Sequence, residues 1–105
     1  MLDYIQARYP QFIDDLETVV NIDSGSNDGA GIMQVAAFFE DRFARLGFST
    51  QIHALDNGRA PCLEVVHRHR TDQPFDFLFL GHMDTVFAAG TVAQRPFRID
   101  GKRAL

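Results

Sequence analysis

Apolar residues recur at helical spacing in two stretches of the first half of the chain. The first set is Ile5, Phe12, Ile13, Leu16, Val19 and Val20, and the second is Ile32, Val35, Ala36, Phe39, Phe43 and Leu46. The first set predicts a main helix over about residues 10–21, with a helical turn before it, because proline is tolerated in a first turn. The second set predicts another amphipathic helix, with Asn27 or Asp28 as its N-cap and Gly47 just beyond its end.

After Gly47 the apolar pattern becomes that of strands. Residues 48–55 alternate in part and predict a first strand. Residues 62–69 predict a second, with Leu63, Val65, His67 and His69 on one face. Residues 75–81 are the most apolar run, so we expect a third strand here and the most deeply buried one. The polar, glycine- or proline-bearing runs 56–58 and 71–74 predict the intervening turns.

The last third of the chain predicts a loop followed by a hairpin. Residues 83–95 carry no strand or helix period. Residues 96–99 and 102–105 flank Asp100-Gly101, which is a strong hairpin signal. Because the second arm has only four residues before Leu105, we expect the sheet to continue beyond the residues given. The predicted fold is α/β, with two helices packed on a sheet whose other strands are missing.

Charge and composition narrow the class of protein. The chain has 10 basic and 14 acidic residues and a net charge of -4, which argues against nucleic acid or an anionic membrane as the main partner. Residues 1–6 lack the basic start and apolar core of a signal peptide, and no apolar run reaches the length of a membrane span. The single cysteine, Cys62, fits a reducing compartment and a small core position. A cytoplasmic protein is therefore predicted.

The candidate chemistry lies in residues 78–86, where an apolar strand ends in His82 and is followed by Asp84. Side chains alternate along a strand, so His82 and Asp84 are expected on the same side. Ligands bind beyond the carboxyl ends of strands in open α/β sheets. The pair suits a metal ligand with an orienting carboxylate, a general base with its orienter in a hydrolytic triad, or a structural pair that holds the strand end. No Gly-x-Ser-x-Gly run is present, which disfavours the triad.

The other histidines and the glycine-bearing run are better explained by structure. His67 and His69 could chelate a metal, but the arginines around them would repel a cation, so we interpret them as solvated strand-end residues. His53 is a lone strand histidine and is interpreted as structural. Residues 24–29 follow a helix rather than a strand, so they are interpreted as a connection and not as a phosphate-binding loop. Phe38, Phe39 and Phe43 are expected in the core.

Residues 81–86, Gly-His-Met-Asp-Thr-Val at the end of an apolar strand, resemble the first metal-site motif of a family of zinc-dependent amidohydrolases. This family includes glutamate carboxypeptidase, acetylornithine deacetylase, succinyl-diaminopimelate desuccinylase and aminoacylase. Residues 16–26 resemble its first helix and the loop after it, and residues 39–48 its second helix. Residues 93–101 resemble the run that leads to the second metal motif. The likeness covers nearly the whole chain and is strongest to the glutamate carboxypeptidase branch.

The resemblance implies a site and an activity for the complete protein. His82 would be a zinc ligand and Asp84 a catalytic residue that supports the site through that ligand. Two zinc ions would be expected per complete catalytic domain, with cobalt or manganese as alternatives. The activity implied is hydrolysis of an amide or peptide bond next to a carboxylate-bearing amino acid, by metal-activated water. The implied substrate is a small peptide or an N-acyl amino acid, and the complete protein would form a homodimer.

The chain also departs from the family pattern. The bridging aspartate, expected after Leu105 in a Gly-Pro-Gly-x-x-Asp run, is absent, as are the Glu-Glu pair that carries the general base and the remaining zinc ligands. A catalytic zinc typically needs three protein ligands and a water molecule. Residues 1–105 are therefore expected to be the N-terminal portion of a metallopeptidase-like catalytic domain, inactive alone. The alternative is a free-standing, non-catalytic binding or interaction module whose exposed sheet edge is covered by a partner or by self-association.

Overall fold

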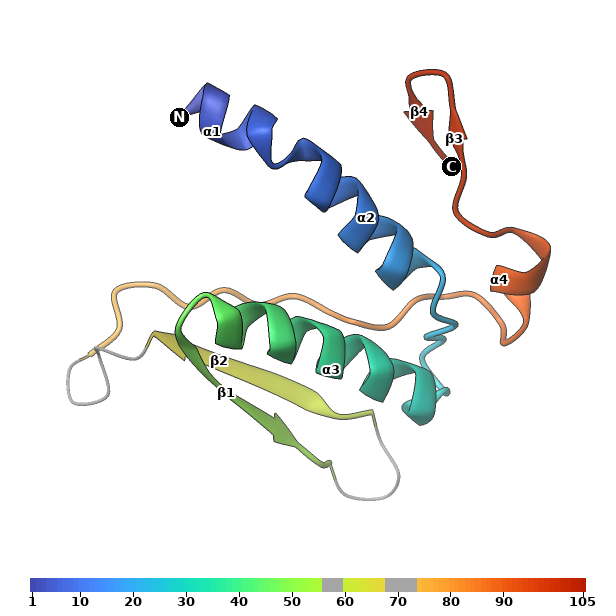
Figure 1. The fold of residues 1–105 in the computed structure, drawn as a ribbon. Helices are drawn as coiled ribbons and strands as arrows, with labels where there is room; N and C mark the ends of the chain where they lie inside the picture. Colours follow the sequence, from blue (N-terminus) through green and yellow to red (C-terminus); the bar gives the residue numbers. More distant parts are fainter. Residues whose placement is uncertain (56–59, 68–73) are drawn as a thin grey trace.

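The computed structural model describes residues 1–55, 60–67 and 74–105. The elements in these ranges are α1 (Leu2–Ala7), α2 (Tyr9–Val20), α3 (Gly29–Arg45), β1 (Phe48–His53), β2 (Cys62–His67), α4 (Thr91–Gln94), β3 (Ile99–Asp100) and β4 (Arg103–Ala104). Figure 1 shows α3 lying along the β1–β2 sheet, with α1 and α2 following one another as a separate arm. The chain is therefore of mixed α and β structure, as predicted.

The two main helices occur where the apolar spacing predicts them. Helix α2 has Pro10 in its first turn, and α1 supplies the helical turn expected before it. Helix α3 begins after Asp28, whose side chain accepts a hydrogen bond from the Gly31 N–H at 2.9 Å. Gly47 follows the helix with a φ of 88°, a left-handed conformation that favours glycine. Both caps predicted for α3 are thus confirmed. None of the helices in the described ranges has the length and apolar character of a membrane span.

Strands β1 and β2 pair antiparallel, from Phe48 opposite His67 to His53 opposite Cys62. Helix α3 covers the pair, and the rings of Phe43 and Phe48 meet edge to face with centroids 5.6 Å apart. The expectation that Cys62 is a core residue is wrong. Cys62 is exposed, because it lies at the end of a sheet that has only two strands in the described ranges. The predicted turn 56–58, and residues 68–69 of the predicted second strand, lie outside the described residues, as does 71–73 of the next turn.

The predicted third strand, residues 75–81, does not form. Figure 1 shows this segment as an extended trace that is not part of a sheet. The side chains of Phe77, Leu78, Phe79 and Leu80 are 79%, 82%, 90% and 87% exposed, so the expectation of deep burial is also wrong. The reason is that no backbone hydrogen bond joins residues 77–83 to the rest of the described chain. A strand without a paired neighbour has no sheet face for other elements to cover.

The C-terminal hairpin forms, with its turn one residue later than predicted. Ile99 pairs with Ala104 and Asp100 with Arg103, so the turn residues are Gly101 and Lys102. Gly101 has a φ of 59°, which a two-residue hairpin turn needs at its first position and glycine adopts at little cost. The sequence signal placed the hairpin correctly, and the strand pairing fixed its register.

The buried core is small for a chain of this length. Within the described ranges, the buried apolar residues are Ile32, Val35 and Ala36, all on α3. The radius of gyration is 15.9 Å, whereas a compact domain of this length has about 13 Å. The prediction that two helices pack on the sheet is therefore wrong for α2. In the part of the chain that the structure describes, only α3 packs closely on the sheet, and the N-terminal arm does not share a core with it.

An ion pair links the N-terminal arm to α3. Arg42 donates from Nη2 and Nε to Oδ1 of Asp15, at 2.7 and 3.1 Å. These hydrogen bonds lower the pKa of the Asp15 carboxyl against a smaller opposing effect of desolvation, and they raise the pKa of Arg42. Both side chains are about one-third exposed, so solvent screens the pair.

Asp15→Asn should therefore weaken the chain in a pH-dependent way. The pKa of Asp15 in the folded chain lies below its ordinary value of 3.8, so the pair contributes above that value and is lost as the pH falls through the lowered pKa. We expect a melting temperature about 2–4 °C below wild type at pH 7 and a difference that shrinks as the pH falls below 3.8. Thermal unfolding followed by circular dichroism measures this. The control Asp14→Asn should show no such pH dependence, and an equal effect of both variants would contradict the link.

Gly31→Ala should destabilise the chain, although alanine is normally the better helix former by about 1 kcal/mol. A Cβ atom on Gly31 would lie 1.8 Å from the carbonyl oxygen of Asp23, so the loop before α3 would have to move. We expect a loss of about 1–3 kcal/mol in the free energy of unfolding, measured in urea. Gly29 is also in α3, and a Cβ atom on it would meet no neighbour within 4 Å. Gly29→Ala should be neutral or stabilising, and similar losses in the two variants would refute this close contact.

Candidate functional site

His82 and Asp84 lie in direct contact. The Nδ1 atom of His82 is 2.9 Å from the backbone carbonyl oxygen of Asp84 and 3.2 Å from its Oδ1. The side chain of His82 is 84% exposed and that of Asp84 37% exposed. The prediction that these two side chains lie on the same side is confirmed. The contact forms although residues 81–84 belong to no paired strand and to no turn.

The second carboxylate oxygen of Asp84 is bonded to Ser26. The Ser26 hydroxyl donates to Oδ2 at 2.6 Å, and its oxygen is also 3.2 Å from the carbonyl oxygen of Thr85. This hydrogen bond is the main cause that lowers the pKa of Asp84. Desolvation opposes it, and the neighbouring His82 adds to the lowering. Asp84 is therefore a carboxylate at neutral pH, with Oδ2 toward Ser26 and Oδ1 toward His82.

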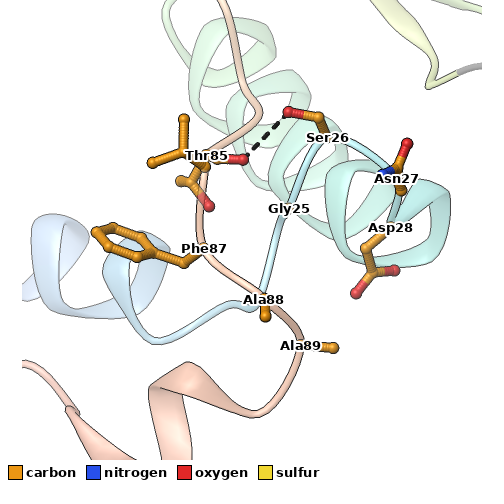
Figure 2. Close-up of a pocket in the computed structure, with 9 residues that line it drawn as sticks. Gly25, Ser26, Asn27, Asp28, Thr85, Phe87, Ala88 and Ala89 are labelled. Carbon is orange, nitrogen blue, oxygen red and sulfur yellow. Dashed lines mark hydrogen bonds between the residues drawn. The ribbon is translucent and has the colours of Figure 1, made fainter.

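The loop between α2 and α3, residues 21–28, carries Ser26 and pairs with the segment after Asp84. The Thr85 N–H donates to the Ser24 carbonyl at 2.8 Å, and the Ser26 N–H donates to the Thr85 carbonyl at 3.1 Å. These bonds form an isolated parallel bridge between Gly25 and Thr85. A Cβ atom on Gly25 would lie 2.5 Å from the carbonyl oxygen of Phe87, so the close approach seen in Figure 2 requires glycine.

Two further side chains of the 21–28 loop hold the segment downstream of the bridge. Asp23 accepts hydrogen bonds from the N–H groups of Gly90 and Val92, at 2.8 and 3.1 Å. Asn21 accepts one from the Phe97 N–H at 2.8 Å. The loop thus supplies the hydrogen-bond partners that fix the chain from Asp84 to Phe97.

A shallow, open pocket of about 490 Å³ lies between the 21–28 loop and the segment after the bridge. Figure 2 shows its lining: Gly25, Ser26, Asn27, Asp28, Thr85, Val86, Phe87, Ala88 and Ala89. Ser26 belongs both to this lining and to the hydrogen bond with Asp84, whereas His82 and Asp84 do not line the pocket. The pocket therefore adjoins the candidate pair on the Ser26 side.

The contacts of His82 determine which ring nitrogen is available. Both groups near Nδ1, a carbonyl oxygen and a carboxylate oxygen, are acceptors. We therefore expect the neutral ring to carry its proton on Nδ1, with the lone pair on Nε2. An exposed imidazole with its lone pair on Nε2 and Nδ1 held by a carboxylate is the form that binds zinc, and it is also the form of a general base.

The described residues fit one ligand position of a zinc site. His82 offers a nitrogen ligand, and Asp84 orients it. No group of three His, Cys, Asp or Glu side chains able to hold a metal is present in the described part of the chain. The other candidate chelators do not change this. The His67 ring meets Phe48 edge to face, and His69 lies outside the described residues.

The geometry does not form a hydrolytic triad. In a triad the histidine bonds to the nucleophilic hydroxyl on one side and to the carboxylate on the other. Here Ser26 and His82 both bond to Asp84, through different carboxylate oxygens. The base that the Ser26 hydroxyl contacts is thus a carboxylate with a lowered pKa, which is too weak to take its proton. Ser26 is therefore not an activated nucleophile.

Sequence reasoning missed Ser26 and Asp23. Residues 24–29 are a connection, as predicted, but a local pattern gives no sign that this connection bonds to Asp84, 58 residues away. The only signal was the resemblance, in which residues 16–26 and the site motif belong to one family pattern. The partners of Asp23 lie 67 and 69 residues further along the chain, beyond any local periodicity.

Comparison with known proteins finds one relevant similarity. The chain is 34% identical over 95 residues to "Carboxypeptidase G2" of Pseudomonas sp. (strain RS-16), which covers 90% of this chain and 23% of that protein. No family model matches the chain. No solved structure matches it. The similarity supports a glutamate carboxypeptidase-like relationship at the level of the family, and the chain spans about a quarter of that relative's length.

The tautomer of His82 can be measured directly. At pH 9, well above the range where histidine normally titrates, the neutral ring should be mainly in the Nδ1–H form, because both neighbours of Nδ1 accept hydrogen bonds. The ¹⁵N chemical shifts of the ring, recorded by long-range ¹H–¹⁵N correlation, report this form. Histidine in an unfolded chain of the same sequence in denaturant is the reference. A His82 ring with the same tautomer ratio as this reference would contradict the contacts with Asp84.

Proposed function

We propose that residues 1–105 are the N-terminal portion of the catalytic domain of a metal-dependent hydrolase. The reaction is cleavage of an amide or peptide bond next to a carboxylate-bearing amino acid, in a small peptide or an N-acyl amino acid. The observation that carries this proposal is the His82–Asp84 contact, in a chain similar over 90% of its length to a carboxypeptidase. The proposal includes a cytoplasmic location and a homodimer of the complete protein.

The exposed apolar segment supports the view that the domain is incomplete. Phe77 and Phe79 stack with ring centroids 6.4 Å apart, and Leu78 and Leu80 alternate with them in sequence, all highly exposed. A segment that is apolar at successive positions is typical of a strand buried on both faces inside an α/β sheet. The described residues supply neither the neighbouring strands nor the covering layers, so we infer that further polypeptide supplies them.

The residues present would perform one part of the chemistry. Zinc, when bound, supplies a Lewis acid for the substrate carbonyl and lowers the pKa of its water molecule. His82 would hold it through Nε2, while Asp84 keeps the proton on Nδ1 and fixes the orientation of the ring. A complete domain would hold two such ions, and cobalt or manganese could replace zinc. The base that takes a proton from the water would come from residues that this chain lacks.

A non-catalytic binding module is the second candidate, and the exposure of residues 77–80 is the observation that favours it. An unpaired extended segment is a template for pairing with another chain, which a dedicated partner could cover. The two candidates differ in the behaviour of the isolated chain. Cooperative unfolding of a soluble chain favours the module, whereas an aggregating or molten chain favours the incomplete domain.

The reading frame of the source DNA after the codon for Leu105 tests the proposed function first. Continuation into Gly-Pro-Gly-x-x-Asp, and later a Glu-Glu pair, would support a two-metal hydrolase. The complete product should then release an amino acid from N-acyl substrates and lose this activity with a chelator. A stop codon directly after Leu105 would overturn the catalytic proposal and favour the binding module.

Substitutions in that complete product test the site. His82→Ala should remove about one zinc ion per subunit and most of the activity, because it removes a ligand. Asp84→Ala should leave folding largely intact and lower turnover about 10–100-fold, as for other carboxylates that orient a metal-bound histidine. Zinc content by mass spectrometry and steady-state kinetics measure these effects. His53→Ala, at a sheet histidine 3.3 Å from Glu64, is the control and should keep both zinc ions. Wild-type rates in His82→Ala or Asp84→Ala would refute the assignment.

A further inference from the structure

We propose that Ser26 is a positioning residue of this site, which fixes the Asp84 carboxylate and through it the ring of His82. The inference makes the loop between α2 and α3, residues 21–28, part of the site and not only a connection. Its consequence for catalysis rests on the proposed function. The positioning itself is a property of the chain as described and can be measured without a metal.

The two carboxylate oxygens of Asp84 contact different residues. Oδ2 accepts from the Ser26 hydroxyl at 2.6 Å, and Oδ1 lies 3.2 Å from Nδ1 of His82. A carboxylate held by one oxygen only can still rotate about its terminal torsion, which is broad for aspartate. The bond to Ser26 removes this freedom and keeps Oδ1 toward the imidazole. Ser26 thus acts on His82 through the carboxylate that both of them contact.

The hydroxyl of Ser26 is a directed donor. It has a single proton and two acceptors in reach, Oδ2 of Asp84 at 2.6 Å and the Thr85 carbonyl at 3.2 Å. The shorter contact is to the charged group, and hydrogen bonds to ionised acceptors are stronger than neutral ones. The proton therefore lies mainly on the line to Asp84.

The backbone of Ser26 is itself fixed from both sides. Its N–H donates to the Thr85 carbonyl, and the Asp28 N–H donates to the Gly25 carbonyl at 2.7 Å, which closes a turn around it. Asp28 then caps α3. The hydroxyl is thus attached to the start of the helix that carries the buried apolar residues, which makes it a rigid point of attachment for Asp84.

Ser26→Ala, Ser26→Thr and Asp23→Ala test the proposal, in the 105-residue chain where it is soluble and folded, and otherwise in the complete protein freed of metal with a chelator. The first readout is the ratio of His82 tautomers from ring ¹⁵N shifts at pH 9, and the second is stability in urea. Ser26→Ala should lower the ratio of Nδ1–H to Nε2–H by at most about fivefold, the effect of losing one hydrogen bond of ordinary net strength, here the one from His82 to Oδ1. The Asp84 carbonyl oxygen, 2.9 Å from Nδ1, remains as an acceptor. Ser26→Thr keeps the hydroxyl and should stay close to wild type.

Asp23→Ala is the matched control, because it removes two hydrogen bonds from the same loop without touching Asp84. It should lower stability and leave the tautomer ratio unchanged. Asp84→Ala, at a partly exposed side chain, keeps the test available should Ser26→Ala not fold. This variant should lower the ratio at least as far as Ser26→Ala. An unchanged ratio in Ser26→Ala, a ratio not restored by Ser26→Thr, an equal change in Asp23→Ala, or no change in Asp84→Ala would overturn the proposal.

The outcome is separable from that of the proposed function. A lower ratio in Ser26→Ala supports positioning even if the complete protein binds no zinc, in which case only the catalytic proposal fails. If the complete protein is a zinc hydrolase, Ser26→Ala should weaken its zinc affinity about tenfold, as loss of outer partners of a ligand does. Unchanged zinc affinity together with an unchanged tautomer ratio would overturn the positioning role and leave the hydrolase intact.

Discussion

The arrangement of the candidate site depends on the pairing of residues 24–26 with Thr85. Two backbone hydrogen bonds join these segments, which are about 60 residues apart in sequence. The segments can approach this closely because Gly25 has no side chain. In this paired arrangement, the Ser26 hydroxyl donates a hydrogen bond to Asp84. Asp23 accepts one from the Gly90 N–H, just before α4. Without this pairing, the extended segment before Asp84 has no backbone partner in the described chain to set its position.

Polar contacts, and not burial in the hydrophobic core, hold the candidate site together. The buried apolar residues in the described ranges lie on one helix, α3, and this helix begins at the loop that holds the site. The contacts at Ser26, Asp23 and Asn21 are hydrogen bonds at a partly exposed position, and each contributes modestly to stability. The site is therefore organised by directed polar contacts, and hydrophobic burial contributes mainly under α3, where the helix meets β1 and β2.

The exposed residues 77–80 lead directly into the site. Their side chains are apolar at every position, yet in this chain they contact mainly solvent. A segment of this kind gains free energy when strands pair with it and layers cover its faces. Any polypeptide that does so would also restrain the backbone that carries His82 and Asp84. We therefore expect that polypeptide which completes the sheet around residues 77–80 also makes the backbone at His82 and Asp84 more rigid.

The sequence alone determined α2 and α3 with the helical turn before them, the caps of α3, the presence of a hairpin around Gly101 and the adjacency of His82 and Asp84, because each depends on residues near one another in the chain. It did not show the short helix α4, which lies in a segment expected to be a loop. Local spacing fixes helical periodicity, capping and the contact between positions two apart. It did not determine the fate of residues 75–81, whose apolar pattern shows what the segment can bury but not whether a partner is present. It also did not reveal Ser26 and Asp23, since their hydrogen bonds join residues 58 to 69 positions apart. Only the tertiary structure decides such contacts, because they depend on where the chain returns in space.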